Sequence, residues 1–326
     1  MKFGIIGAGN HAYTRVMPAI MESGNSIEAV YSRDISKAER IGKEYSARGL
    51  SDLDHLVGED IDAVYIASPN FLHHDHAKKA IEHGKHVLLE KPMVLKNEDG
   101  LNLIKMAETN HVKLAMGFHL RFHPMLNDIK QVIEKGKIGD IVYITGKWLY
   151  ASSAYRDPEP DRSWWSDPGK AGGGAIMGTG VHIIDTVSSI MPELPEYISA
   201  TRIPESKIIE DFEAIDMDYR KSVASIICSR IINNVDNSLH IYGNEGTIVG
   251  EGFFNTVVDA RLIVNNNIVQ TYQSDKYHMY RNEIDAFVKY VNNQPSGIAR
   301  GVDGYNAVRI VNAAYESYIT KTIIKF

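Results

Sequence analysis

The 326-residue chain contains a single cysteine, Cys228. One thiol cannot form an intrachain disulfide, and it is too few for an iron–sulfur cluster or for a zinc site built from several cysteines. Because Cys228 follows the largely apolar run 223–227, we expect a buried and unreactive thiol.

The chain also lacks a surplus of positive charge and any long apolar run. Lys and Arg number 35 against 41 Asp and Glu, a formal net charge of −6, so binding to a nucleic-acid backbone is not expected. No apolar run approaches the roughly 18 residues of a membrane span. The apolar stretch 3–6 ends at Gly7, too short for the core of a signal peptide. We therefore expect a cytoplasmic protein with no nucleic-acid or membrane partner.

The composition is that of a globular protein, with 44% apolar and 23% charged residues. At about 150 residues per domain, the length suggests two domains or one large one. Through the first 120 residues, short apolar runs alternate with segments of helical spacing, which predicts βαβ units and a parallel sheet. The expected strands are 3–6, 27–31, 63–67, 86–89 and 113–117, and the expected helices are 14–22, 36–46 with Ser36 as N-cap, 74–83 and 97–109.

The pattern changes near residue 120. After one more expected helix at 125–135, strand-like runs dominate, and short turn signals separate several of them. Strands joined without intervening helices favour an antiparallel sheet. We therefore predict two domains, 1–120 and 121–326. The later expected strands are 141–148, 198–203, 222–232, 238–242, 247–249, 261–264 and 268–272, and helices return at 280–292 and 304–320.

A glycine-rich loop, Gly7-Ala8-Gly9-Asn10-His11-Ala12, lies between the first expected strand and helix. Gly7 permits a tight turn, Gly9 lets the backbone approach a pyrophosphate, and Ala12 keeps the third position small for helix–strand packing. The start of the following helix offers N–H groups to phosphates. The loop, with Asn10 and His11, therefore predicts dinucleotide binding; the alternative is an ordinary strand–helix turn.

The residues after the second expected strand bear on which nucleotide binds. NAD sites usually place an acidic side chain about 20 residues beyond the glycine loop, where it accepts a bond from the ribose 2′-hydroxyl. This chain has Ser32 and then Arg33. A hydroxyl and a guanidinium suit a 2′-phosphate, which arginine can bind through two parallel bonds. We expect NADP, with NAD left open because Asp34 is either a ribose ligand or a helix cap.

Three further motifs, together with the glycine loop, resemble the glucose–fructose oxidoreductase / inositol dehydrogenase family, and the resemblance covers nearly the whole chain. The motifs are Ser68-Pro69-Asn70-Phe71-Leu72-His73, then Gly84-Lys85-His86-Val87-Leu88-Leu89-Glu90-Lys91-Pro92, and Gly172-Gly173-Gly174-Ala175-Ile176-Met177 running into Gly180-Val181-His182-Ile183-Ile184-Asp185.

The resemblance implies an α/β Rossmann domain with a parallel sheet, followed by an α+β domain for substrate binding and oligomerisation. The second domain is expected to hold a mostly antiparallel, open-faced sheet. It also implies an NAD(P)-dependent oxidoreductase that transfers hydride between the nicotinamide and a secondary hydroxyl or ketone of a sugar, cyclitol or related polyol. Such substrates bind between the two domains. Ser68, Asn70, His73, Glu90 and Lys91 then join the predicted cofactor site.

Two residues are expected to carry the proton chemistry. Lys91 directly follows a strand at the carboxyl edge of the sheet, where ligands bind, and the matching family lysine contacts both cofactor and substrate hydroxyl. His182 lies on a helix expected to begin near Gly172–Gly174, and an imidazole, with an ordinary pKa of about 6.5, suits proton exchange at neutral pH. The alternatives are a surface lysine and a packing histidine.

Three further side chains are expected to bind substrate. Asp185 lies one helical turn beyond His182 and either holds that ring or packs against another helix. Arg121 matches a family arginine near the cleft. Trp165, next to Trp164, offers an aromatic face for sugar C–H groups, although packing between domains explains it equally well.

One position departs from the family pattern. Many relatives carry Asp four residues before the histidine, where this chain has Gly178. Tyr155, Arg162 or Asp185 are candidates to replace it. The departure leaves two alternative functions open: a catalytically altered regulator that senses the nucleotide, and a reductase of a non-sugar carbonyl.

We expect no metal ion. The histidines between residues 73 and 86 are as closely spaced as the ligands of a metal site. However, His73 matches a family cofactor residue, and the others suit solvent-exposed positions on a helix. His119 and His123 have a four-residue spacing, yet Pro124 argues against the continuous helix that a zinc pair would need. The Ile- and Val-rich segment 222–272 predicts an apolar sheet face buried in a homodimer or homotetramer.

Overall fold

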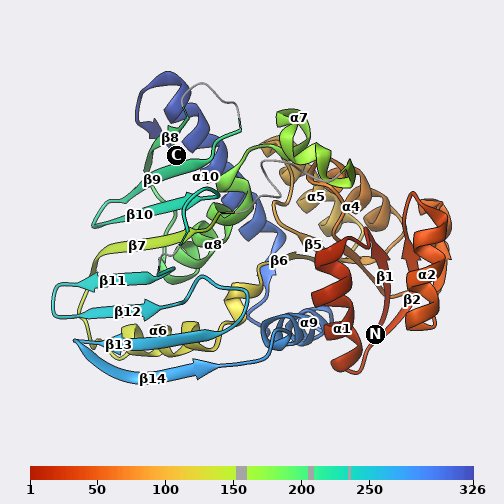
Figure 1. The fold of residues 1–326 in the computed structure, drawn as a ribbon, viewed down its shortest axis with the longest axis horizontal. Coiled ribbons are helices and arrows are strands. Elements are labelled where there is room, and N and C mark those ends of the chain that lie inside the picture. Colours follow the sequence, from red (N-terminus) through yellow and green to blue (C-terminus); the bar gives the residue numbers. More distant parts are fainter. Residues whose placement is uncertain (152–159, 205–208, 234–235) are drawn as a thin grey trace. The chain divides into compact units, whose positions relative to one another are not determined.

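The computed structural model describes residues 1–151, 160–204, 209–233 and 236–326 (Figure 1). Contacts divide the chain into two compact units. The first comprises Met1–His119 and Tyr277–Asn306, and the second comprises Leu120–Lys276 and Ala307–Phe326. The sequence-based division assigned everything after residue 120 to the second domain, whereas the structure returns residues 277–306 to the first unit.

The first unit is built on a seven-stranded sheet with the order β15-β6-β5-β4-β1-β2-β3. All its strands are parallel except β15, which pairs antiparallel with β6. The central strands are nearly continuous apolar runs because helices cover both faces of a parallel sheet. The strands are β1 (Lys2–Ile6), β2 (Ser26–Tyr31), β3 (Arg48–Leu50), β4 (Ala63–Ile66), β5 (His86–Glu90), β6 (Leu114–Gly117) and β15 (Ala299–Arg300).

The helices of this unit follow the expected alternation, which confirms the Rossmann fold. The first begins with a π-helical turn, η1 (Ala12–Val16), and continues as α1 (Met17–Glu22). Ser36 is not an N-cap: Asp34 caps α2 (Ile35–Tyr45), accepting a bond from the Lys37 N–H at 3.3 Å. The others are α3 (Leu53–Gly58), η2 (Asn70–Leu72), α4 (His73–Glu82), α5 (Asn97–Thr109) and α9 (His278–Val291). The short helix η3 (His119–Phe122) spans the boundary at which the chain passes into the second unit.

Residues 277–306 return to the first unit because they bury its apolar surface and extend its sheet. The Phe287 ring of α9 lies 6.0 Å from that of Phe3 in β1. Arg281 pairs with Glu22 at the end of α1 at 2.5 Å. At the edge of the sheet, Ala299 pairs with Met116. These contacts join positions more than 180 residues apart, which local sequence patterns do not reveal.

The second unit holds a nine-stranded sheet with the order β14-β13-β12-β11-β7-β10-β9-β8-β16. Only β7 and β10 pair in parallel, so the sheet is mostly antiparallel, as predicted. The strands are β7 (Ile141–Leu149), β8 (Tyr197–Ile203), β9 (Phe212–Tyr219), β10 (Ser222–Ser229), β11 (Leu239–Gly243), β12 (Thr247–Glu251), β13 (Asp259–Val264), β14 (Asn267–Gln273) and β16 (Ile324–Lys325).

One face of this sheet is packed against helices. A continuous helical segment, η6 (Ile176–Gly180) followed by α8 (Val181–Ile190), packs on β7 and β10. α6 (Pro124–Glu134) packs on β13, and the end of α10 (Gly301–Thr320) packs on β8 (Figure 1). Cys228 on β10 is fully buried, and burial raises the pKa of its thiol, as expected for an unreactive cysteine.

The opposite face of the sheet mixes aromatic, aliphatic and polar side chains. The rings of Tyr143 and Tyr242 stack at 5.8 Å between centroids, and His240 stacks on Tyr242 at 6.1 Å. Val223, opposite Tyr143 on the neighbouring strand, is 39% exposed. Among the described residues, no helix is both long and apolar enough to cross a membrane.

Candidate active site

The glycine loop of the first unit has the shape that a bound pyrophosphate requires. Gly7 has φ +94°, and a Cβ there would lie 2.6 Å from the Ser68 nitrogen, so only glycine fits. A Cβ on Gly9 would meet no atom within 4 Å, which leaves space above the backbone at that position. Asn10 and His11 are exposed at the start of the helix. The loop therefore fits a dinucleotide.

The other predicted nucleotide contacts lie at the same edge of the sheet, because parallel strands end there together. Ser32 and Arg33 follow β2, and Ser68 and Asn70 follow β4. Arg33 is exposed, and the Ser32 hydroxyl accepts a bond from the Asp34 N–H at 3.2 Å. The Asp34 carboxylate caps α2 by accepting the Lys37 N–H, as one of the two expected roles of this residue requires.

His73 connects two loops at this edge. Its Nδ1 lies 2.7 Å from the Pro92 carbonyl and its Nε2 2.8 Å from the Ser68 carbonyl. Burial lowers the pKa of His73, and the two carbonyl bonds oppose that change. Both ring nitrogens are thus used within the protein, so His73 holds the Ser68 loop against the segment after Lys91. Nearby, His76 lies 2.9 Å from the Ser68 hydroxyl.

Glu90, at the end of β5, is a buried carboxylate surrounded by donors. The Tyr65 hydroxyl donates to it at 2.8 Å, the Lys91 N–H at 3.3 Å, and the His11 Nε2 lies at 3.3 Å. Burial alone would raise the pKa of Glu90, but the charge and hydrogen bond of His11, with help from Lys91 and Tyr65, lower it to about 2. Glu90 therefore supplies a fixed negative charge beside Lys91.

Tyr65 was not predicted from the sequence as part of this site. Its side chain is fully buried in β4, and a buried tyrosine hydroxyl needs a hydrogen-bond partner. The sequence did contain a clue to this role. A tyrosine within an otherwise apolar strand implies a polar partner for its hydroxyl on a neighbouring strand. Tyr280 is also part of this region, since its ring stacks on His119 at 4.8 Å and meets His11 edge-on at 5.5 Å.

Lys91 follows Glu90 and is half-buried. Burial lowers the pKa of its ammonium group, and the Glu90 charge partly opposes this. A lysine that releases its proton more readily than usual suits proton exchange with a substrate hydroxyl. The carboxyl edge of the sheet therefore holds a carboxylate that stays ionised, Glu90, next to a lysine of lowered pKa, Lys91.

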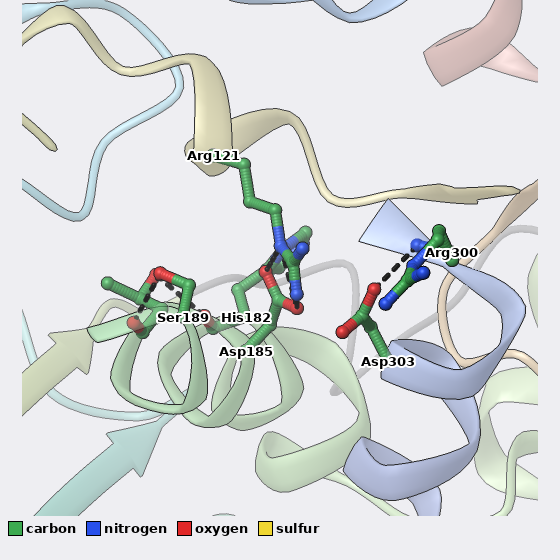
Figure 2. Close-up of polar contacts among 7 residues, drawn as sticks. Arg121, His182, Asp185, Ser189, Arg300 and Asp303 are labelled. Atoms are coloured by element: carbon green, nitrogen blue, oxygen red, sulfur yellow. Dashed lines mark hydrogen bonds and ion pairs between the residues drawn. The ribbon is translucent and has the colours of Figure 1, made fainter. Parts of the chain in front are cut away.

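In the second unit, the η6–α8 segment carries His182 and Asp185 (Figure 2). His182 is buried, and its ring centroid lies 5.5 Å from that of Trp148. Asp185 is bound by Arg121 through two parallel contacts, at 2.9 Å from Nε and 2.7 Å from the guanidinium NH2 group. The structure therefore brings Arg121 and Asp185 together as a buried ion pair.

Two other predicted positions, Trp165 and Gly178, lie in helical turns of this unit. Trp165, in η5 (Pro160–Ser166), is half-buried, and its ring lies 5.9 Å from that of Trp164. Gly178 lies in η6, where its N–H donates to the Gly174 carbonyl at 3.0 Å. Tyr155 and the side chain of Arg162 lie outside the described residues. Within the described residues, no group of three or more His, Cys, Asp or Glu could hold a metal ion.

A Rossmann unit with a dinucleotide loop, joined to a unit with one helix-covered mixed sheet, is the architecture of a class of nucleotide-dependent oxidoreductases. The chain belongs to the GFO/IDH/MocA oxidoreductase family. Residues 1–118 match its NAD-binding Rossmann fold, and residues 130–326 match its C-terminal alpha/beta domain. The resemblance expected from the motifs is thereby confirmed.

Individual proteins show how far this similarity extends. An oxidoreductase of Synechocystis is 32% identical over 273 residues, covering 76% of this chain and 71% of its own. D-xylose 1-dehydrogenase (NADP(+)) 2 of Haloferax volcanii is 24% identical and covers 100% of this chain and 99% of its own. The structure of aldose-aldose oxidoreductase from Caulobacter crescentus superposes with a TM-score of 0.89 at 19% identity, covering 100% and 99% of the two chains.

Proposed function

We propose that this oxidoreductase interconverts a secondary hydroxyl and a ketone on a sugar, cyclitol or related polyol, with a nicotinamide nucleotide as cofactor. The observation that carries the proposal is the Glu90–Lys91 pair at the carboxyl edge of the parallel sheet. It combines a fixed carboxylate with a partly buried, less basic ammonium group. The sugar substrates in the names of the Haloferax and Caulobacter relatives support the substrate class.

The chemistry divides between cofactor and protein. When bound, the nicotinamide accepts or supplies the hydride. Oxidation of an alcohol also releases a proton from oxygen, and reduction requires one there. We assign that proton to Lys91 and His182, the two side chains predicted to serve the substrate oxygen. Arg121 and Trp165 are proposed to contact the substrate, and Asp185 to act through its ion pair with Arg121.

The test is turnover of a panel of sugars, cyclitols, and their keto forms, followed by nucleotide absorbance. We expect at least one polyol to be oxidised or its ketone reduced. Tight nucleotide binding with no turnover across the panel would instead identify a nucleotide-sensing regulator. A cytoplasmic location is part of the proposal, and the unpaired thiol of Cys228 suits a reducing compartment.

We predict that NADPH binds more tightly than NADH. Ser32 and the exposed Arg33 lie at the end of β2, and Asp34 is engaged as a helix cap. Loss of a charge-assisted bond costs about 1.5–3 kcal/mol, or roughly 10- to 100-fold in affinity. The Haloferax relative is named as an NADP(+) enzyme. Fluorescence titration should show the preference, and Arg33→Ala should remove it while Lys37→Ala on the following helix should not. Equal affinities in the wild type would contradict the prediction.

We further predict a dimer, or a tetramer built from dimers, formed through the open face of the second unit's sheet. Tyr143, Val223, His240 and Tyr242 give that face a half-exposed aromatic and aliphatic centre, and tyrosine is enriched in protein interfaces. Light scattering at micromolar concentration should give at least twice the monomer mass. Val223→Asp should yield monomers, whereas Ile319→Asp, on α10, should not. A monomeric wild type would refute the interface.

A further inference from the structure

Glu210 lies just before β9 and binds the start of the helix that carries His182. Its carboxylate accepts bonds from the Gly174 N–H at 2.9 and 3.0 Å and from the Ile176 N–H at 2.9 Å. Its backbone carbonyl accepts the Ala175 N–H at 3.1 Å. Three successive N–H groups at the helix start are thus satisfied by one residue more than 30 positions away. The Tyr315 hydroxyl donates to the same carboxylate at 3.2 Å.

This contact explains the run of three glycines at positions 172–174. A Cβ on Gly174 would overlap the Glu210 carbonyl oxygen, and a Cβ on Gly173 would overlap the Tyr315 hydroxyl. Gly172 has φ +79° and ends the preceding helix, α7 (Pro168–Ala171). The glycines therefore allow the helix start to reach Glu210 and Tyr315.

A second carboxyl group, that of Glu213, lies close to Glu210 in this region. Glu213, three residues further on, is fully buried, and neither of its carboxyl oxygens has a hydrogen-bond partner within the described part of the chain. Burial and the nearby Glu210 carboxylate raise the pKa of Glu213 to about 9, so it is protonated at neutral pH. Burial raises the pKa of Glu210, while the bonds from the Ile176 and Gly174 N–H groups and the Tyr315 hydroxyl oppose that change.

We propose that Glu210 is a positioning residue for His182, fixing the start of the η6–α8 segment so that the imidazole is held in place for proton transfer. The proposal rests on the function proposed above. His182 lies six residues beyond Ile176, about 9 Å along a helix, so a displaced helix start moves the ring directly. Misplacing a catalytic group by about 1 Å can lower a rate by about 100-fold.

The test compares Glu210→Gln with Glu213→Gln in the full chain. Glutamine keeps the shape of Glu210 but turns one acceptor oxygen into a donor facing the Gly174 and Ile176 N–H groups. At Glu213 the same change replaces a neutral acid by a neutral amide of equal size. Amide hydrogen exchange across residues 172–186, kcat, KM and the Kd for NADPH are measured for both variants at pH 7.

We expect Glu210→Gln to speed exchange at the helix start at least 10-fold and to lower kcat about 10- to 100-fold, with KM and the NADPH Kd within about threefold of wild type. Glu213→Gln should match the wild type in all four. Unchanged exchange, unchanged kcat, or an equal loss in Glu213→Gln would overturn the proposal. If the wild type turns over no substrate, the proposed function fails, and exchange alone then decides whether Glu210 fixes this helix.

Discussion

Replacement of Lys91 by methionine is expected to lower kcat by about 10²- to 10⁴-fold, the usual contribution of a positioned acid or base. Methionine keeps most of the aliphatic stem and removes the ammonium group. Glu90 keeps its bonds to Tyr65, His11 and the backbone N–H of residue 91, so its burial remains compensated. The fold should therefore be retained, and the NADPH affinity should weaken only modestly.

The measurement is steady-state turnover, combined with thermal unfolding and nucleotide titration of the same preparations. Lys96→Met is the matched control, because Lys96 is an exposed lysine five residues along the same segment. It should behave as the wild type in all three assays. If Lys91→Met retained more than about a tenth of the wild-type kcat, Lys91 would not be the acid or base that we assign.

Replacement of His182 by glutamine should give a loss of similar size, again about 10²- to 10⁴-fold in kcat. Glutamine can still form hydrogen bonds, but it does not titrate. Lys91 and His182 are assigned to the same proton transfer. The kcat of the double variant Lys91→Met/His182→Gln should therefore be only slightly lower than that of the less active single variant. Independent roles would instead multiply the two losses.

Ser189→Ala is the control on the same helix. The Ser189 hydroxyl donates to the Thr186 carbonyl at 2.8 Å, and its removal should leave kcat within about twofold of wild type. A His182→Gln variant with normal turnover would show that this buried ring has a packing role against Trp148. If the fold losses in kcat of the two single variants multiplied in the double variant, Lys91 and His182 would act in different steps.

The local elements were largely predictable from the sequence. The helix expected at 97–109 is α5, and most other expected elements differ from the structure by one to three residues at their ends. These segments have strong apolar periodicity and clear Gly or Pro boundaries. The strand β9 was not predicted. Its residues alternate between buried and more exposed positions, but Glu213 occupies one of the buried positions, where an apolar residue is normally expected.

The candidate site was predictable where it depends on short motifs. The glycine loop and the segment ending in Glu90 and Lys91 lie where their positions after strands indicated. The Tyr65–Glu90 bond and the Glu210 contacts were not foreseen, because each joins residues 25 or more positions apart. The ion pair between Arg121 and Asp185 was not foreseen for the same reason, although the sequence predicted that each residue binds substrate. Long-range polar partners depend on tertiary packing that periodicity does not encode.

The return of residues 277–306 to the first unit sets an order of events during synthesis. The first 119 residues leave the ribosome without β15 or α9, so the edge of β6 and the ring of Phe3 lack their partners until residue 306 has been made. At about 5–20 residues per second, the remaining stretch takes roughly 10–40 s. During that interval the nascent nucleotide-binding half exposes the edge of β6 without its pairing partner.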